Sequence, residues 1–230
     1  MKRFYRDATV APGEDGYSVT LDGKPLRTPG KAELRVPSRA LAEAIAAEWR
    51  AQVSEVRPQN LPLTRLANTA LDLVTPRRAQ IVAEIANYAG TDLLCYRAEH
   101  PPELVARQAR IWQPLLDWAA ERYAPLTVTA GVLPCAQPVE SLAAFTAAVE
   151  AFDAMRLAAL HLATAACGSL VLALALAEMR LDPESAFAAA QLEESFEIER
   201  WGEDAEQTRR RAALQDDIAL AARFVALLNG

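Results

Sequence analysis

Residues 17–23 read Tyr-Ser-Val-Thr-Leu-Asp-Gly, and this short stretch sets the fold of the first part of the chain. Its side chains alternate between apolar and polar types, which indicates a β-strand with one buried face. Asp-Gly is a strong hairpin signal, so the chain is expected to reverse at that point. Further strands are expected at residues 4–10, 26–28 and 32–36, separated by turns at 12–16 and 29–30. The stretch therefore predicts an antiparallel meander whose apolar face needs a cover.

A covering helix is expected directly after the meander. Ser38 is a suitable N-cap, and Leu41, Ile45 and Trp49 then recur at helical spacing. A short helix at about residues 63–72 follows. These segments predict a β-rich N-terminal domain over residues 1–75.

From residue 76 onward the sequence favours helix almost throughout, and residues 76–230 are predicted to form an all-helical C-terminal domain. Helices are expected at about residues 75–88, 103–123, 139–152, 155–179, 183–201 and 204–228. Thr75 is expected to cap the first of them, and Pro114 to kink or interrupt the second. A lone β-like run at 126–133 is a candidate to pack back against the N-terminal sheet. The predicted fold class is α+β.

The composition is that of a folded protein without a prosthetic group. Hydrophobic residues make up 52% of the 230 residues and charged residues 23%. The three cysteines lack metal-ligand spacing and there are only two histidines, so no metal is predicted. The nine glycines form no dinucleotide-binding fingerprint or Walker-type loop, so no cofactor-binding loop is predicted.

The charge argues against nucleic acid as a partner. The net charge is −6, whereas a nucleic-acid-binding surface is normally basic. Residues 1–100 carry a net +2 and residues 101–230 a net −8. Solubility is the simplest explanation of the acidic second half, and a partner with a basic surface is the other.

Residues 157–177 carry no charge over a length that could cross a bilayer. Alanine is abundant there, polar residues interrupt the run, and no aromatic residue flanks it. We therefore expect a buried central helix and no membrane span. The first residues also lack the apolar core of a signal peptide.

Cys95 is the one candidate nucleophile that lies near a histidine, His100, and an acid, Asp92. No oxyanion-hole motif accompanies these residues, and a buried thiol beside a solvent-facing histidine is the simpler interpretation. No catalytic residue is therefore predicted. The alternative is a small-molecule enzyme with a site around Asp92, Cys95 and Arg97, in a cleft between the two domains.

The expected helix at 187–201 combines two apolar stripes with internal charge. At 100° per residue, one stripe holds five residues: Phe187, Gln191, Glu194, Ile198 and Trp201. Leu192 and Phe196 mark the second stripe, and Glu193 lies on the polar face. A carboxylate inside an apolar stripe is costly if it is buried alone. Glu194 is therefore either paired with an arginine of the same domain or part of a recognition surface for a basic group. The triplet Arg209–Arg211 is interpreted as mixed-charge helix surface.

Several stretches resemble one known family in both sequence and order. They are Phe-Tyr at 4–5, Val-Thr-Leu-Asp-Gly-Lys-Pro-Leu-Arg-Thr-Pro at 19–29, Ala-Glu-Trp at 47–49, Pro-Leu-Thr-Arg-Leu-Ala-Asn-Thr-Ala-Leu-Asp at 62–72, Thr-Asp-Leu-Leu-Cys-Tyr-Arg at 91–97, Trp-Gln-Pro-Leu-Leu-Asp-Trp at 112–118 and Leu-Glu-Glu-Ser-Phe-Glu-Ile-Glu-Arg-Trp-Gly at 192–202. The chain resembles the F-type ATP synthase assembly chaperones that act on the α subunit, the mitochondrial assembly factor 2 family. The resemblance covers some two hundred residues.

This resemblance implies a two-part fold and a chaperone without catalytic residues or a bound nucleotide. Family members hold the unassembled α subunit, keep its β-subunit-facing surface from aggregating, and leave as the α/β ring forms. The chain lacks the organelle-targeting leader of eukaryotic members, so a bacterial protein acting in the cytoplasm is expected. The 187–201 segment is the candidate contact surface, with Glu194 as the first choice of contact residue and Glu193 as the second.

Overall fold

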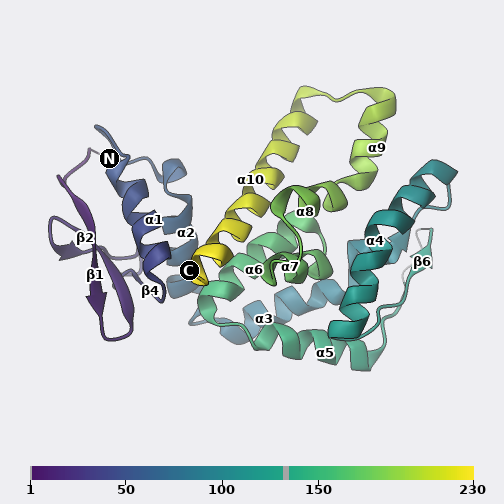
Figure 1. Ribbon diagram of the computed structural model, residues 1–230, viewed down its shortest axis with the longest axis horizontal. Helices are drawn as coiled ribbons and strands as arrows, with labels where there is room; N and C mark the ends of the chain where they lie inside the picture. Colours follow the sequence, from purple (N-terminus) through teal and green to yellow (C-terminus); the bar gives the residue numbers. More distant parts are fainter. Residues whose placement is uncertain (1, 132–134) are drawn as a thin grey trace. The chain divides into compact units, whose positions relative to one another are not determined.

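The N-terminal strands form an antiparallel sheet whose pairing order differs from that of the expected meander in the computed structural model, which describes residues 2–131 and 135–230 (Figure 1). Its strands are β1 (Ala8–Gly13), β2 (Gly16–Leu21), β3 (Lys24–Pro25) and β4 (Arg35–Val36). The order is β1-β2-β3, and β4 pairs with the remaining part of β2; all pairings are antiparallel. Asp22 and Gly23 form the turn with positive φ angles of 49° and 80°, a conformation that the Asp-Gly pair tolerates.

The helix α1 (Arg39–Arg50) packs against β1 and β2 and supplies the predicted cover. The Ser38 side chain accepts the backbone N–H of Leu41, which confirms it as the N-cap. Leu41, Ile45 and Trp49 are all buried. The apolar spacing read from the sequence therefore gives the buried face of this helix correctly.

The chain from residue 58 to 87 is almost continuously helical. It comprises the 3-10 turn η1 (Pro58–Asn60), α2 (Pro62–Thr69), the π-helical turn η2 (Ala70–Val74) and α3 (Arg78–Asn87). The carboxylate of Glu48 in α1 accepts the first backbone N–H groups of α2, from Leu63 and Thr64, at 2.7 and 2.9 Å. Thr75 was expected to begin a new helix, which is wrong: its hydroxyl donates to Ala70 O and continues the preceding turn.

The rest of the chain is mainly helical, as predicted. Its elements are the turns η3 (Tyr88–Thr91) and η4 (Leu93–Cys95), and the helices α4 (Pro102–Arg122), α5 (Val139–Glu150), α6 (Ala154–Cys167), α7 (Leu170–Ala177), α8 (Pro183–Ala190), α9 (Leu192–Trp201) and α10 (Ala205–Leu228). Pro114 lies inside α4 and does not interrupt it. An α+β fold is confirmed.

Two expected helices are each divided in the structure. Residues 155–179 were expected to form one helix, but Gly168 adopts a φ of 64° and Ser169 caps a new helix, α7, by accepting Leu172 N–H. Residues 183–201 were also expected to be one helix. They break at Gln191, whose φ and ψ of −105° and 23° leave the helical range.

The β-like run beyond residue 126 pairs differently from the expectation. Its described part contains β6 (Thr129–Ala130), which pairs in parallel with β5 (Tyr96–Arg97). The suggestion that it packs against the N-terminal sheet is therefore wrong for these residues, and residues 132–133 of the run lie outside the described ones. The β5–β6 pair ties the loop after α4 to the segment after η4.

The chain divides into two compact units, of which the first contains Met1–Arg78, Asp153–Ala159 and Arg223–Gly230. The second unit contains Ala79–Phe152 and Leu160–Ala222. The first unit thus adds short pieces of α6 and α10 to the sequence range proposed for the N-terminal domain. Among its fully buried side chains are Leu34, Leu41, Ile45, Leu63 and Leu157, and among those of the second unit Ile85, Leu94, Trp112, Phe145 and Leu170.

The uncharged run at 157–177 is shared between α6 and α7. Among the described helices of residues 2–131 and 135–230, none is both long enough and apolar enough to cross a membrane. Residues 170–176 of α7 are all buried within the protein.

Trp49 offers a direct test of the N-terminal core. Its indole N–H donates to Thr64 Oγ1 at 3.1 Å, and its ring lies 5.5 Å from that of Tyr5. We expect Trp49→Arg to lower the free energy of unfolding by about 3–5 kcal/mol, because it removes a buried aromatic side chain and inserts a charge. Trp49→Phe, which keeps most of the volume, is expected to cost clearly less. Denaturant titration measures both, and an unchanged midpoint for Trp49→Arg would contradict this placement.

Candidate partner-binding site

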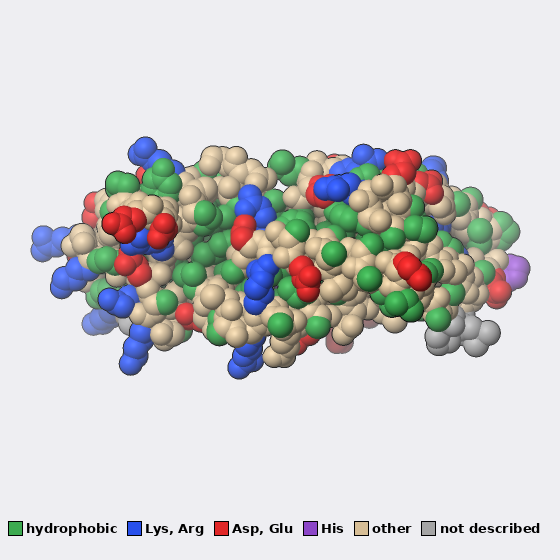
Figure 2. Space-filling view, turned by 90° about the horizontal axis from the view of Figure 1, so that it is seen from below, with side chains coloured by type: hydrophobic (Ala, Val, Ile, Leu, Met, Phe, Trp, Pro, Cys, Tyr) green, Lys and Arg blue, Asp and Glu red, His purple; other side chains and the backbone are tan. Residues whose placement is uncertain are grey.

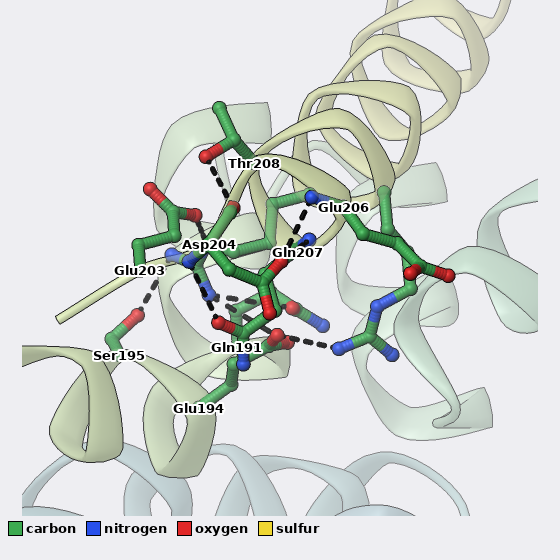
Figure 3. Close-up of polar contacts among 10 residues, drawn as sticks. Gln191, Glu194, Ser195, Glu203, Asp204, Glu206, Gln207 and Thr208 are labelled. Carbon is green, nitrogen blue, oxygen red and sulfur yellow. Dashed lines mark hydrogen bonds and ion pairs between the residues drawn. The ribbon is translucent and has the colours of Figure 1, made fainter. Parts of the chain in front are cut away.

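The break at Gln191 places two neighbouring glutamates in different surroundings. Phe187 lies on α8 and Glu194 on α9, so these residues do not share one straight helix as the sequence projection assumed. Phe187, Gln191 and Glu194 nevertheless come together, because all three contact Arg211 of α10. Figure 3 shows Gln191 and Glu194 close together in the polar network between α9 and α10. They meet around an internal arginine.

Glu194 is an ion-pair partner within the second unit. Its carboxylate lies 2.5 Å from Arg210 Nη2 and 3.8 Å from Arg211 Nη1, and only 14% of its side chain is exposed. Two members of the arginine triplet that was interpreted as plain helix surface therefore hold this acid. Of the two accounts left open from the sequence, an arginine partner in the same domain is the arrangement found.

Arg211 is the centre of this network. Its guanidinium donates to Ser195 Oγ at 3.0 Å and Gln191 Oε1 at 3.4 Å, and its Nε lies 3.4 Å from Glu203 Oε1. It also lies over the Phe187 ring, 5.2 Å from the centroid. With its side chain 16% exposed, Arg211 joins α10 to α9 through polar contacts and to α8 through the Phe187 ring.

Glu193 has a different environment. Gln108 of α4, which is fully buried, donates its Nε2–H to Glu193 Oε1 at 2.6 Å. The other end of the Gln108 amide accepts the N–H of Ala98 at 2.8 Å. Gln108 therefore fixes the Glu193 carboxylate relative to the segment after β5.

The Glu193 carboxylate lines a pocket of about 600 Å³ in the second unit. The other lining residues are Leu93, Tyr96, Arg97, Ala98, Glu99, His100 and Gly131. Partial burial, and then the negative charge of Glu197, raise the pKa of Glu193 above its ordinary value. Among the described residues, no Lys or Arg forms an ion pair with this carboxylate. The pocket thus presents a partly desolvated acid that would gain from a cationic partner.

The remaining stripe residues differ in exposure. Ile198 is half-buried, whereas Trp201, at the end of α9, has 84% of its surface exposed. Leu192 and Phe196 are buried and form the inner face of α9. Gly202 then ends the helix with a φ of 84°, as expected.

The residues of the alternative enzyme site make contacts that stabilise the fold. Asp92 is fully buried and accepts hydrogen bonds from Leu94 N–H, Ser169 Oγ and Val171 N–H at 3.0, 2.7 and 3.0 Å. Burial, together with the Asp92 charge, raises the pKa of the Cys95 thiol to about 12. Cys95 therefore stays a neutral thiol at physiological pH, which argues against a nucleophilic role.

Arg97, the third residue of that site, donates to Leu94 O at 2.9 Å and lies over the Trp112 ring. Within residues 2–131 and 135–230, no group of three His, Cys, Asp or Glu side chains is arranged to hold a metal ion.

Comparison with known proteins identifies the family. The model of the ATP12 chaperone protein family matches residues 2–120, which is more than half of the chain. The chain belongs to the ATP12 chaperone family. The resemblance inferred from sequence motifs is thereby confirmed, and with it a chaperone role in ATP synthase assembly.

Individual relatives agree with this assignment. The mitochondrial atp12 protein of Schizosaccharomyces pombe is 26% identical over 221 residues, which cover 90% of this chain and 76% of that protein. The crystal structure of Atp12 from Paracoccus denitrificans is 42% identical, with a TM-score of 0.95 over 99% of this chain and 98% of that one. A structure from Agrobacterium tumefaciens is 44% identical, with a TM-score of 0.93 over 99% and 86% of the two chains.

The Glu194 ion pairs predict a stability defect for charge reversal. Glu194→Lys would place a cation beside Arg210 and Arg211, and we expect it to lower the free energy of unfolding by about 2–4 kcal/mol. Glu197→Lys, at an exposed position of the same helix, is expected to change it by less than about 0.5 kcal/mol. Urea titration of both variants measures this difference. Equal stability of the two would show that the ion pairs contribute little.

The raised pKa of Glu193 predicts a pH-dependent cost. A carboxyl that holds its proton more tightly when folded favours folding at low pH, and this contribution is lost as the pH rises from the ordinary value of 4.5 through the folded pKa. We expect the free energy of unfolding of the Glu193→Gln variant, relative to that of the original protein, to increase over this interval. Denaturant titration at a series of pH values measures both free energies of unfolding. If the two proteins show parallel pH profiles, the environment of the Glu193 charge is not unfavourable.

Proposed function

We propose that this protein is an ATP-independent assembly chaperone for the α subunit of the F-type ATP synthase catalytic sector. It binds the unassembled α subunit, shields the surface meant for the β subunit, and hands α over to the α/β ring. Family membership supports the chaperone role, and the resemblance of the sequence motifs supports α as the client. Bacterial relatives at 42–44% identity support a bacterial protein, which would act in the cytoplasm where α is made.

The observation that carries the proposal is the state of Glu193. An unpaired carboxylate loses solvation when it is half-buried, and its raised pKa reflects that cost. A Lys or Arg side chain of the client, entering the pocket, would relieve the cost and gain a charge-assisted hydrogen bond. A residue kept in an unfavourable environment by a buried glutamine is better explained by recognition than by folding stability.

The surroundings of Glu193 suit a protein client. Leu93, Tyr96 and Ala98 give the pocket apolar walls, and the exposed Trp201 lies at the end of the helix that carries Glu193. Apolar contact combined with the oriented Glu193 carboxylate, beside the polar lining residues Arg97, Glu99 and His100, provides selectivity without requiring very tight binding. A chaperone that must be displaced by the β subunit needs such limited affinity.

The contacts of the two acids support a new order of preference between them. Glu194 was the first choice for client contact, but both of its arginine partners come from α10. Glu193 has no such partner in the described part of the chain and lines the pocket. We therefore propose Glu193 as the client-binding acid, with Ile198 and Trp201 as apolar contacts beside it. Phe187, Gln191 and Glu194 support this surface through their contacts with Arg211.

An aggregation assay tests the proposal. The α subunit is diluted from denaturant without ATP, and light scattering is recorded with and without the chaperone. We expect suppressed scattering and a one-to-one complex with α on gel filtration, and neither with an unrelated client. Glu193→Lys is expected to lower the affinity for α by at least about tenfold, the loss of one charge-assisted contact and the gain of a repulsive one.

Matched variants separate binding from folding. Asp216→Lys, at an exposed position of α10, changes the net charge equally and is expected to retain α binding, since Asp216 does not line the pocket. If the Glu193→Lys protein has the same free energy of unfolding as the original and binds α as tightly, Glu193 is refuted as the contact residue. Unchanged scattering and no complex with the original protein would refute the α subunit as its client.

A further inference from the structure

We propose that a groove in the first unit is a second docking site, which takes an extended client segment with an apolar side chain between carboxylates. The groove is lined by Phe4, Tyr5, Leu21, Asp22, Lys24, Pro25, Leu26 and Arg27, and its volume is about 390 Å³. All of these residues belong to the first unit, whereas the Glu193 pocket belongs to the second. The inference rests on the proposed function only in taking the segment to be part of a client.

The floor of the groove is apolar and fixed. Tyr5, Leu21 and Leu26 are buried, and the Tyr5 hydroxyl donates to the backbone carbonyl of Trp49 at 2.8 Å. Leu26 N–H donates to Val19 O at 2.8 Å within the sheet. The floor is thus held by the same core that Trp49 stabilises, so a ligand would meet a preformed surface.

Phe4 provides an exposed apolar wall. Its ring packs edge-on against Tyr5 with a centroid separation of 5.3 Å, yet 63% of the residue remains exposed. Pro25 is exposed at the edge strand β3. Proline has no N–H to offer a further strand, so we expect recognition through side chains more than through strand addition. A single leucine or phenylalanine side chain would bury apolar surface against both residues.

The rim of the groove favours negative charge. Lys24 and Arg27 are exposed, and Arg27 is held in place by a hydrogen bond from its Nη1 to Lys31 O. The one acid on the lining, Asp22, is already engaged: its oxygens accept the backbone N–H groups of Arg6 and Asp7 at about 3 Å. These contacts lower the pKa of Asp22, so its carboxylate stays ionised and satisfied by backbone donors. With the two cations the lining carries a net charge of +1, and Lys24 and Arg27 are the groups that can pair with a carboxylate of the ligand.

The net charge of the first unit also favours an acidic ligand. The first unit contains 15 Lys and Arg residues against 10 Asp and Glu, a net +5, while the second unit carries a net −11. Figure 2 shows Lys and Arg side chains projecting around the N-terminal unit, at the left of the view. Such a field steers acidic segments toward the groove. Two rim cations are too few for a nucleic-acid track, which needs a continuous basic surface.

A peptide titration tests the groove on the intact protein. The probe is a fluorescein-labelled, acetylated and amidated peptide, Glu-Leu-Glu-Leu-Glu-Leu-Glu, and the comparison peptide has Lys in place of Glu. We expect the acidic probe alone to bind, with an affinity that falls as salt is raised from about 50 to about 300 mM. Lys24→Glu and Phe4→Ser are each expected to weaken binding at least about fivefold.

A matched variant controls for net charge. Arg39 is exposed at the start of α1 and does not line the groove, so Arg39→Glu is expected to leave the peptide affinity within about twofold. If Arg39→Glu and Lys24→Glu lose peptide affinity equally, the loss reflects the net charge of the protein and the docking site is overturned. No binding of the acidic peptide up to about 1 mM, or equal binding of the basic peptide, would overturn it as well.

The same protein preparation also tests two other possible occupants of the groove, a nucleic acid and a second copy of the chain. Tighter binding of an oligo-dT probe than of the peptide, lost in Lys24→Glu, would assign the groove to nucleic acid. Self-association that is abolished by Lys24→Glu in sedimentation would assign it to a second copy of the chain. Either result overturns the proposal. The peptide assay contains no α subunit, so its failure is independent of the α-binding test at Glu193.

Discussion

The buried carboxylate of Asp92 organises the second unit. It accepts hydrogen bonds from Leu94 in the turn that follows it and from Ser169 and Val171 at the start of α7, and it is fully enclosed. Burial raises its pKa, and these donors offset part of the cost of the charge. Because Leu93 N–H also donates to Gly168 O, the residues that begin the pocket wall are fixed to the same helix boundary. Asp92 therefore positions part of the pocket wall without lining the pocket itself.

The break at Gln191 gives adjacent glutamates opposite roles. Glu194 faces α10, where two arginines neutralise it, and Glu193 faces α4, where a buried glutamine holds it without neutralising it. One acid contributes to the structure at low cost, and the other carries an electrostatic cost that a cationic partner would remove. In the proposed function, this division keeps the helical surface stable alone and leaves Glu193 available for a client.

The sequence predicts the local elements better than the continuity between them. The Asp22–Gly23 turn, the Ser38 cap and the Gly202 stop follow from single residues with strong backbone preferences. Gly168 followed by Ser169 indicates a helix break in the sequence. The long uncharged run at 157–177 nevertheless led to the prediction of one continuous helix. No glycine or proline lies at Gln191, so the sequence does not indicate the break there. A projection at 100° per residue assumes one straight helix, so it placed Phe187 and Glu194 in a single stripe, and it gave no sign of the contact between Gln108 and Glu193.

Hydrogen–deuterium exchange of the protein alone and in complex with the α subunit tests the central claim most directly. If client recognition centres on the Glu193 pocket, backbone amides of residues 93–100 and 192–201 gain protection in the complex. The segments around the Arg211 network in α10, which are already paired within the protein, change much less. A complex that forms while residues 93–100 and 192–201 exchange as in the free protein would contradict the account.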